Sequence, residues 1–199
     1  MNFIYYRVSD SGGPDGEIGA SMRYLSQRFT MPNRTSAAVL NDIGTEELAH
    51  LEMVSTMVHQ LTRDLTMEEI ENSGLGPYYI DHTVGVWPQA AGGVPFNACE
   101  FQSKGDPITD LFEDLAAEQK ARSTYDNILR VVRNIPEVAD PIRFLRAREV
   151  VHFQRFGRNH FAPSRNSWML KTSTLSIQAL TIPALQAVHL KQNSICCWS

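Results

Sequence analysis

The chain has 199 residues, of which 43% are hydrophobic and 20% charged, and its formal net charge is −4. This length suits one globular domain, and a mildly acidic chain without a long basic run is not expected to bind nucleic acid. No apolar stretch reaches the ~18 residues that a membrane span needs, and residues 1–10 lack the apolar core of a signal peptide. We therefore expect a soluble cytoplasmic protein with neither nucleic acid nor membrane as a partner.

Four helices are predicted from caps and hydrophobic periodicity. The first begins near residue 14 and runs to residue 29, and the second spans residues 35–61, with a short amphipathic turn at residues 66–71. The third and fourth begin with the same device, an aspartate N-cap followed by proline at N1. Asp106-Pro107 opens a helix that runs to residue 133, and Asp140-Pro141 opens one that runs to residue 156.

A long connection, residues 72–105, separates the second helix from the third. Two helical hairpins joined by one long crossover are typical of ferritin-like four-helix bundles. We therefore predict an all-α, ferritin-like bundle domain over residues 1–157. Residues 158–199 contain no Asp or Glu and differ in kind, so they are predicted to form a separate, atypical C-terminal tail without an assigned role.

Two of the predicted helices carry a Glu-x-x-His motif on the stripe that should face the core. In the second helix, every third and fourth residue gives Leu40, Ile43, Glu47, His50, Val54, Met57 and Leu61. In the fourth helix, the same count gives Ile142, Leu145, Glu149, His152 and Phe156. Glu and His three positions apart on a helix point the same way, so both can reach one ion.

The other two helices each add a carboxylate. Glu118 lies on the core line of the third helix, and the first helix carries Glu17 and Tyr24 two turns apart on one face. In the first helix these two residues flank an apolar line, namely Ile18, Met22, Leu25 and Phe29.

Buried carboxylates are costly unless they are paired or bind a metal. Four carboxylates and two imidazoles on inward faces are the ligand set of the di-iron and di-manganese carboxylate sites of helix bundles. Oxygen and imidazole donors without thiolate suit manganese or iron. The residue pattern therefore predicts a dinuclear site of Mn or Fe, and on this count Glu149 is a ligand.

Other polar residues near the motifs are expected to have ordinary roles. Glu46 and Glu52 lie off the stripe of the second helix and are predicted to be solvated. His59 and His82 are predicted to be surface or hydrogen-bonded histidines. Tyr24 is either a core side chain or a hydrogen-bond donor to the site, and the sequence alone leaves both readings open.

Four blocks of sequence occur in order, GGPDGEIGASMRYLSQRF, DIGTEELAHLEM, GDPITDLFEDLAAEQKARSTY and FLRAREVVHF. They closely resemble the manganese catalase family, in particular its short branch of spore coat proteins of the CotJC type. The resemblance covers residues 12–157 and implies a ferritin-like bundle that holds two manganese ions and disproportionates hydrogen peroxide to water and dioxygen. It also implies a homo-oligomer and, in a spore-forming bacterium, a place in the spore coat beside other coat proteins.

Carried over residue by residue, the resemblance assigns the bridging carboxylate to Glu47. One manganese takes Glu17 and His50, and the other takes Glu118 and His152. Glu149 then matches a proton carrier beside the metals rather than a ligand, and Tyr24 matches a tyrosine next to the site. This assignment of Glu149 differs from the count based on helical periodicity, and we follow the family.

Two features depart from the family pattern. The segment before the GGPDGE block is short, and the resemblance ends after Phe156. Two rival readings of the function also remain open: a di-iron oxidase or rubrerythrin-like protein with nearly the same ligands, and a structural coat protein that retains a metal site.

Overall fold

The computed structural model describes residues 16–73 and 96–161 of the chain, and every regular element within them is helical. The elements are α2 (Glu17–Gln27), the 3-10 helix η1 (Arg28–Thr30), α3 (Arg34–Thr62), α4 (Met67–Ser73), the 3-10 helix η2 (Ala98–Glu100), α6 (Pro107–Val132) and α7 (Pro136–Phe161). They lie in the first of two compact units, Met1–His160, apart from the last residue of α7. The predicted all-α class is confirmed.

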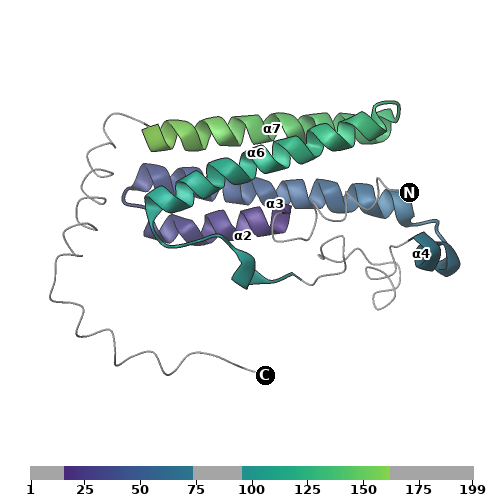
Figure 1. Cartoon of the computed structure of the whole chain (residues 1–199), viewed down its shortest axis with the longest axis horizontal. Coiled ribbons are helices and arrows are strands. Elements are labelled where there is room, and N and C mark those ends of the chain that lie inside the picture. The colour runs from purple at the N-terminus through teal and green to yellow at the C-terminus, as the bar shows by residue number, and fades with distance from the viewer. Residues whose placement is uncertain (1–15, 74–95, 162–199) are drawn as a thin grey trace, which may run out of the picture. The chain divides into compact units, whose positions relative to one another are not determined.

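Helices α2, α3, α6 and α7 form a four-helix bundle (Figure 1). Short turns join α2 to α3 and α6 to α7, so each pair is a helical hairpin. Of the connection predicted between the hairpins, residues 74–95 lie outside the described residues, as does the predicted tail from residue 162 onward. The division of the chain at residue 157 therefore stays a prediction.

Helices α3 and α6 each begin directly after a residue whose side chain caps the helix N-terminus. The side chain of Asn33 accepts a hydrogen bond from the Ser36 amide at the start of α3. Asp106 does the same for the amide of Thr109 at the start of α6, with Pro107 at the first helical position as predicted. These bonds satisfy amides that have no partner inside the helix.

The predicted start of the fourth helix at Asp140-Pro141 is wrong, because α7 begins at Pro136 and contains Pro141. A proline within a helix removes one backbone hydrogen bond. Here the additional turn buries Val138 and Ala139 completely or nearly so, and the Ala139 amide bonds to the Ile135 carbonyl at 2.8 Å. Packing of this turn against the core sustains the helix across the proline.

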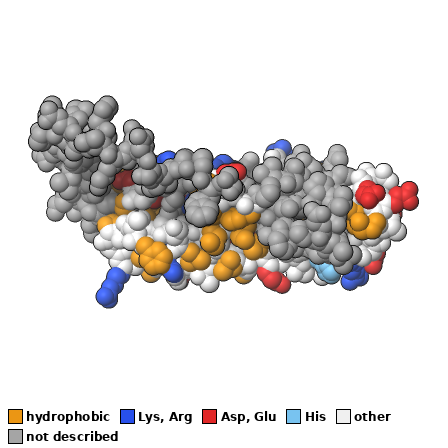
Figure 2. Space-filling model, turned by 90° about the horizontal axis from the view of Figure 1, so that it is seen from below, with side chains coloured by type: hydrophobic (Ala, Val, Ile, Leu, Met, Phe, Trp, Pro, Cys, Tyr) orange, Lys and Arg blue, Asp and Glu red, His pale blue; other side chains and the backbone are white. Residues whose placement is uncertain are grey.

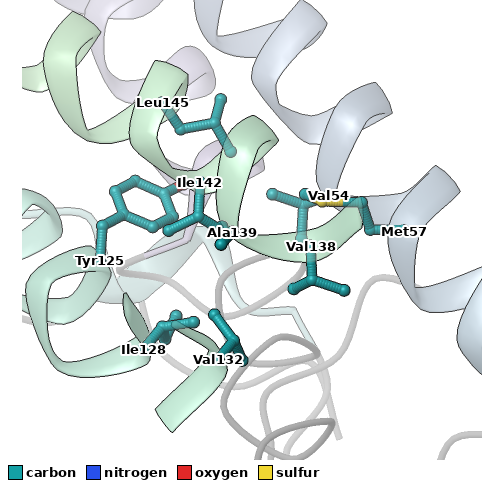
Figure 3. Close-up of a cluster of buried hydrophobic side chains, with 9 residues drawn as sticks. All are labelled: Val54, Met57, Tyr125, Ile128, Val132, Val138, Ala139, Ile142 and Leu145. Carbon is teal, nitrogen blue, oxygen red and sulfur yellow. The ribbon is translucent and has the colours of Figure 1, made fainter. Parts of the chain in front are cut away.

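Two hydrophobic clusters fill the bundle along its length. One joins α3, α6 and α7 (Figure 3) and consists of Val54, Met57, Tyr125, Ile128, Val132, Val138, Ala139, Ile142 and Leu145. The other joins all four helices and consists of Tyr24, Leu40, Ile43, Leu111, Leu115 and Phe156. Between them, α3 and α7 each present a Glu-x-x-His motif to the interior.

Helix α2 turns inward the face that carries Glu17 and Tyr24, and part of the apolar line beside it is exposed, including Phe29 in η1. Met22 is 47% exposed and Phe29 79% exposed, whereas Glu17, Ser21, Tyr24 and Gln27 are buried. Glu17, Ser21 and Tyr24 have hydrogen-bond partners on other helices inside the bundle, which offsets the cost of burying them. Figure 2 shows hydrophobic side chains gathered on the side of the molecule where α2 lies in Figure 1.

No helix in the described segments is long and apolar enough to span a bilayer.

Candidate metal centre

The six predicted metal-site residues converge in the interior of the bundle. All are buried, and the most accessible of them, Glu17, is only 5% exposed. The set comes from four helices: Glu17 from α2, Glu47 and His50 from α3, Glu118 from α6, Glu149 and His152 from α7. Helical periodicity thus predicted correctly which faces of α3 and α7 point inward.

Glu47 lies between the two histidines. Its Oε2 is 2.7 Å from Nδ1 of His50, and its Oε1 is 2.8 Å from Nδ1 of His152. The two imidazole rings are stacked, with centroids 5.4 Å apart. One carboxylate therefore faces both rings, each oxygen toward a different Nδ1.

A further carboxylate accompanies each histidine. Glu17 Oε2 lies 3.7 Å from Nδ1 of His50, and Glu118 Oε2 lies 3.4 Å from Nδ1 of His152. The arrangement has two similar halves, each with one histidine and one carboxylate of its own, and Glu47 is common to both.

Two tyrosines hold the outer carboxylates. Tyr24 Oη on α2 donates a 2.6 Å hydrogen bond to Glu118 on α6, while its ring belongs to a core cluster, so both readings of Tyr24 hold. Conversely, Tyr125 on α6 donates a hydrogen bond to Glu17 on α2. The sequence analysis did not identify this role of Tyr125, because a periodicity shows the face of a residue and not its partner.

A close approach of α2 to α3 brings Glu17 toward His50. A Cβ added to Gly44 would lie 2.9 Å from Leu25 Cγ and 3.2 Å from Tyr24 Cβ. The hydroxyl of Ser21 also donates a 2.7 Å hydrogen bond to the Gly44 carbonyl. Glycine at position 44, three residues before Glu47, is therefore what permits this packing distance.

The charges of the metal-free centre are strongly coupled. Burial acts to raise the pKa of Glu47, but the neighbouring imidazoles lower it to about 2. Burial acts to lower the pKa of both histidines, yet the adjoining carboxylates raise each to about 10. At neutral pH an anionic Glu47 thus lies between two imidazolium rings.

Several buried polar atoms at the centre make no hydrogen bond to any described residue. They are both carboxylate oxygens of Glu47, both ring nitrogens of His50 and His152, Glu118 Oε2 and Glu149 Oε1. Glu47, His50, Glu149 and His152 can each offer a ligand atom within 4.8 Å of the others. Buried, unsatisfied oxygen and imidazole donors aimed at one point fit a divalent transition metal such as manganese.

Glu149 lies in the same group of side chains, so its position alone is compatible with either a ligand or a proton carrier. Its Oε1 lies 3.6 Å from Nδ1 of His50. Burial, followed by the negative charges of Glu118 and Glu47, raises its pKa well above the ordinary value. A carboxyl group in this setting binds a proton readily, which is the property of a proton carrier.

A cavity of about 250 Å³ lies beside the centre, between α2 and α6. Glu17, Glu118 and Glu149 line its inner part, and the exposed Lys120 also contributes to its wall. Small side chains, Ala20, Ala117 and Ala121, account for much of the remaining lining. The cavity gives a molecule of the size of hydrogen peroxide room beside three carboxyl groups.

The prediction that Glu46 is solvated is wrong. Its side chain is only 26% exposed, and its two carboxylate oxygens accept hydrogen bonds of 2.5 and 3.0 Å from the guanidinium of Arg148. Its oxygens lie 3.1 Å from Nε2 of His152 and 3.7 Å from Nε2 of His50. Glu52 and His59 are exposed as predicted, whereas His82 lies outside the described residues.

Comparison with known proteins agrees with this geometry. The sequence pattern of the family described as manganese containing catalase matches residues 8–161. The CotJC protein of Bacillus subtilis strain 168 is 50% identical over 151 residues, which are 76% of this chain and 79% of that protein. The chain therefore belongs to the manganese-containing catalase family, in its CotJC-type branch.

More distant relatives carry the name of the activity. A probable manganese catalase of Clostridium acetobutylicum is 33% identical over 71% of this chain, but the chain spans only 62% of that relative's length. The crystal structure of KatB, a manganese catalase from Anabaena, matches with a TM-score of 0.70 and 27% identity, over 81% of this chain and 74% of that one. The fold is thus the ferritin-like bundle predicted from the sequence.

Proposed function

We propose that this protein is a dimanganese catalase, which converts two molecules of hydrogen peroxide into two of water and one of dioxygen. The observation that carries the proposal is the Glu47 carboxylate, placed between two histidines that each have a second carboxylate close by. Membership of the manganese-containing catalase family supports manganese as the metal.

The geometry favours one set of roles for the ligands. Glu47 would be shared by the two ions, Glu17 and His50 would hold one of them, and Glu118 and His152 would hold the other. The contacts of 3.7 and 3.4 Å that pair each outer carboxylate with its histidine support this division. Two manganese ions bound here supply a two-electron couple between their divalent and trivalent states.

The remaining residues orient ligands and handle protons. Tyr24 and Tyr125 fix the outer carboxylates by hydrogen bonds, so that each presents its other oxygen to the centre. Glu149 accepts a proton from peroxide that enters the adjoining cavity and returns it to the water that leaves. Reduction of one peroxide consumes two protons, and oxidation of a second releases two, so a single carrier close to the centre can serve both halves of the cycle.

A second candidate is a role in the spore coat. The 50% identity to CotJC favours it, since the sequence resembles the branch of the family that is associated with the coat. A purely structural role would not require five buried metal-binding side chains with a further buried carboxyl group beside them. We therefore treat the coat as a location for the enzyme rather than as its sole function.

Metal analysis, combined with measurements of dioxygen release from peroxide and of dioxygen consumption, separates these candidates from a di-iron oxidase. The chain is produced once with manganese and once with iron, and the content of each metal is determined. The manganese form should carry about two ions per chain and release dioxygen from peroxide. An iron form that consumes dioxygen, together with a manganese form that is inactive with peroxide, would favour the rubrerythrin-like alternative.

A further inference from the structure

One carboxylate lies behind both histidines of the centre. Nδ1 of each ring faces Glu47, so the outer nitrogen Nε2 of each ring points to the opposite side. On that side Glu46 Oε2 is 3.1 Å from Nε2 of His152, and Glu46 Oε1 is 3.7 Å from Nε2 of His50. Glu46 and Glu47 are consecutive in α3 and therefore face the two sides of the same pair of rings.

Arg148 fixes the position of Glu46. Its Nε and Nη2 bind the two carboxylate oxygens separately, across 102 positions of sequence. Such a two-point contact fixes both the place and the plane of a carboxylate. Both side chains are partly shielded, 29% exposed for Arg148 and 26% for Glu46. The pair links α3 to α7, the two helices that carry the Glu-x-x-His motifs.

We propose that Glu46, held by Arg148, is a shared positioning residue for His50 and His152. A histidine that binds a metal through one ring nitrogen usually donates its other N–H to an acceptor, which sets the tautomer and the orientation of the ring. Glu46 places one oxygen 3.1 Å from Nε2 of His152 and the other 3.7 Å from Nε2 of His50, where it would accept from these N–H groups once each Nδ1 binds a metal. This inference rests on the proposed dinuclear centre and adds to it a carboxylate that tunes both ions at once.

The structure supplies a matched control. Arg155 Nη2 binds Asp42 Oδ2 at 2.8 Å, and this ion pair also links α7 to α3. Asp42 lies four residues before Glu46, about one turn along α3, and Arg155 lies seven after Arg148, about two turns along α7. Within the described residues, neither member forms a hydrogen bond or ion pair with His50 or His152, so removal of this pair tests the helix contact without the histidine contact.

The experiment measures manganese affinity and content rather than activity. Dissociation constants for Mn²⁺ are determined by competition with a chelator for the full chain and for its Glu46→Ala, Glu46→Gln, Arg148→Met and Asp42→Asn variants. Glu46→Ala should weaken binding at both sites by about 10–100-fold, the usual effect of losing such a partner. Arg148→Met should weaken both sites less, and Asp42→Asn should change neither.

Glu46→Gln gives the sharpest test and also covers a failure of Glu46→Ala to fold. An amide has one acceptor oxygen, and its NH₂ group cannot accept from a second ring N–H. One manganese should therefore stay tight while the other weakens, which electron paramagnetic resonance would show as loss of the coupled pair. Equal, undiminished affinity for two ions in Glu46→Gln or Glu46→Ala would overturn the proposal, as would an equal loss in Asp42→Asn. Failure of the unaltered chain to bind manganese would instead refute the proposed function.

Discussion

The phenol of Tyr24, on α2, donates a hydrogen bond of 2.6 Å to Glu118, 94 positions further along the chain on α6. Tyr125 on α6 donates a hydrogen bond to Glu17 on α2 in the opposite direction. The helix that supplies the outer carboxylate of one half therefore also supplies the tyrosine that binds the outer carboxylate of the other half. These crossed contacts tie the two halves of the metal centre together.

Removal of either phenol should weaken one half of the centre. Tyr24→Phe keeps the ring, which packs edge-on against Phe156 with centroids 5.0 Å apart, and deletes only the donor. A hydrogen bond to a charged group contributes about 1.5–3 kcal/mol, so we expect roughly a tenfold or greater loss of Mn²⁺ affinity at one site. Tyr125→Phe should cause a similar loss at the other site. Titration with Mn²⁺ measures both, and unchanged affinity in both variants would show that the tyrosines only pack.

Glu149 and His152 should respond differently to substitution although they share a face of α7. Glu149→Gln keeps the shape of the side chain but cannot accept a proton. We expect manganese to stay near two ions per chain while peroxide turnover falls by about 10²–10⁴-fold. His152→Ala should instead empty or weaken one site.

Metal analysis and dioxygen release on the same samples check the pair of variants. Loss of an ion from Glu149→Gln would mean that Glu149 is a ligand. That outcome would restore the arrangement that helical periodicity alone suggested and would raise the di-iron alternative.

Gly44→Ala should destabilise the bundle near the centre. Its Cβ would lie 3.2 Å from Tyr24 Cβ and 2.9 Å from Leu25, so α2 must move away from α3. We expect the free energy of unfolding to fall by about 1–3 kcal/mol, as for other overpacked sites. Gly157→Ala on α7 is the matched control, since its Cβ would meet only Leu115, at 3.9 Å. Denaturant unfolding of the two variants gives the comparison, and an equally mild effect of both would show that the α2–α3 contact is looser than described.

Manganese binding should release protons and strengthen as the pH rises. In the metal-free chain His50 and His152 have pKa values raised to about 10, so both are protonated at neutral pH. Manganese binds only the neutral ring, so binding near pH 7 should release about two protons from the imidazoles. Affinity should therefore increase from neutral pH up to about pH 10, in step with the loss of these protons.

The same pKa shifts determine how the free energy of unfolding of the metal-free chain changes with pH. A raised histidine pKa stabilises the folded state fully below the ordinary value of 6.5, and this contribution disappears as the pH passes about 10.

For the binding prediction, calorimetry in buffers of different ionisation enthalpy counts the protons that are released when manganese binds. A proton count of zero with a flat affinity would contradict the assigned charges.

Sequence periodicity predicted the interior of α3 and α7 well and the rest of the centre less well. The inward faces that carry Glu47, His50, Glu149 and His152 follow from apolar neighbours three and four positions away. Glu46 escaped the same reasoning, because its partner Arg148 is 102 positions distant and only the packing of α3 on α7 brings the two together. A stripe of apolar residues identifies the buried face of a helix but does not show which residues beside that face contact the metal centre.

Helix α2 shows the limit of the hydrophobic pattern more plainly. Met22 on its apolar line is 47% exposed and Phe29, just beyond it in η1, is 79% exposed, while Glu17 and Tyr24 beside that line face the interior. The burial of polar residues depends on partners from other helices, which a single helix cannot reveal. The start of α7 was missed for a related reason, since tertiary packing of its first turn outweighs the cost of Pro141.

The ratio of dioxygen released to peroxide consumed by the manganese-loaded chain tests the central claim most directly. A dimanganese catalase releases one dioxygen for every two peroxides, because the electrons taken from one peroxide reduce the other. The same chain stripped of metal, and a Glu47→Ala variant that lacks the bridging carboxylate, should release none above background. Consumption of peroxide without dioxygen, or a folded chain that carries two manganese ions and leaves peroxide intact, would contradict the account.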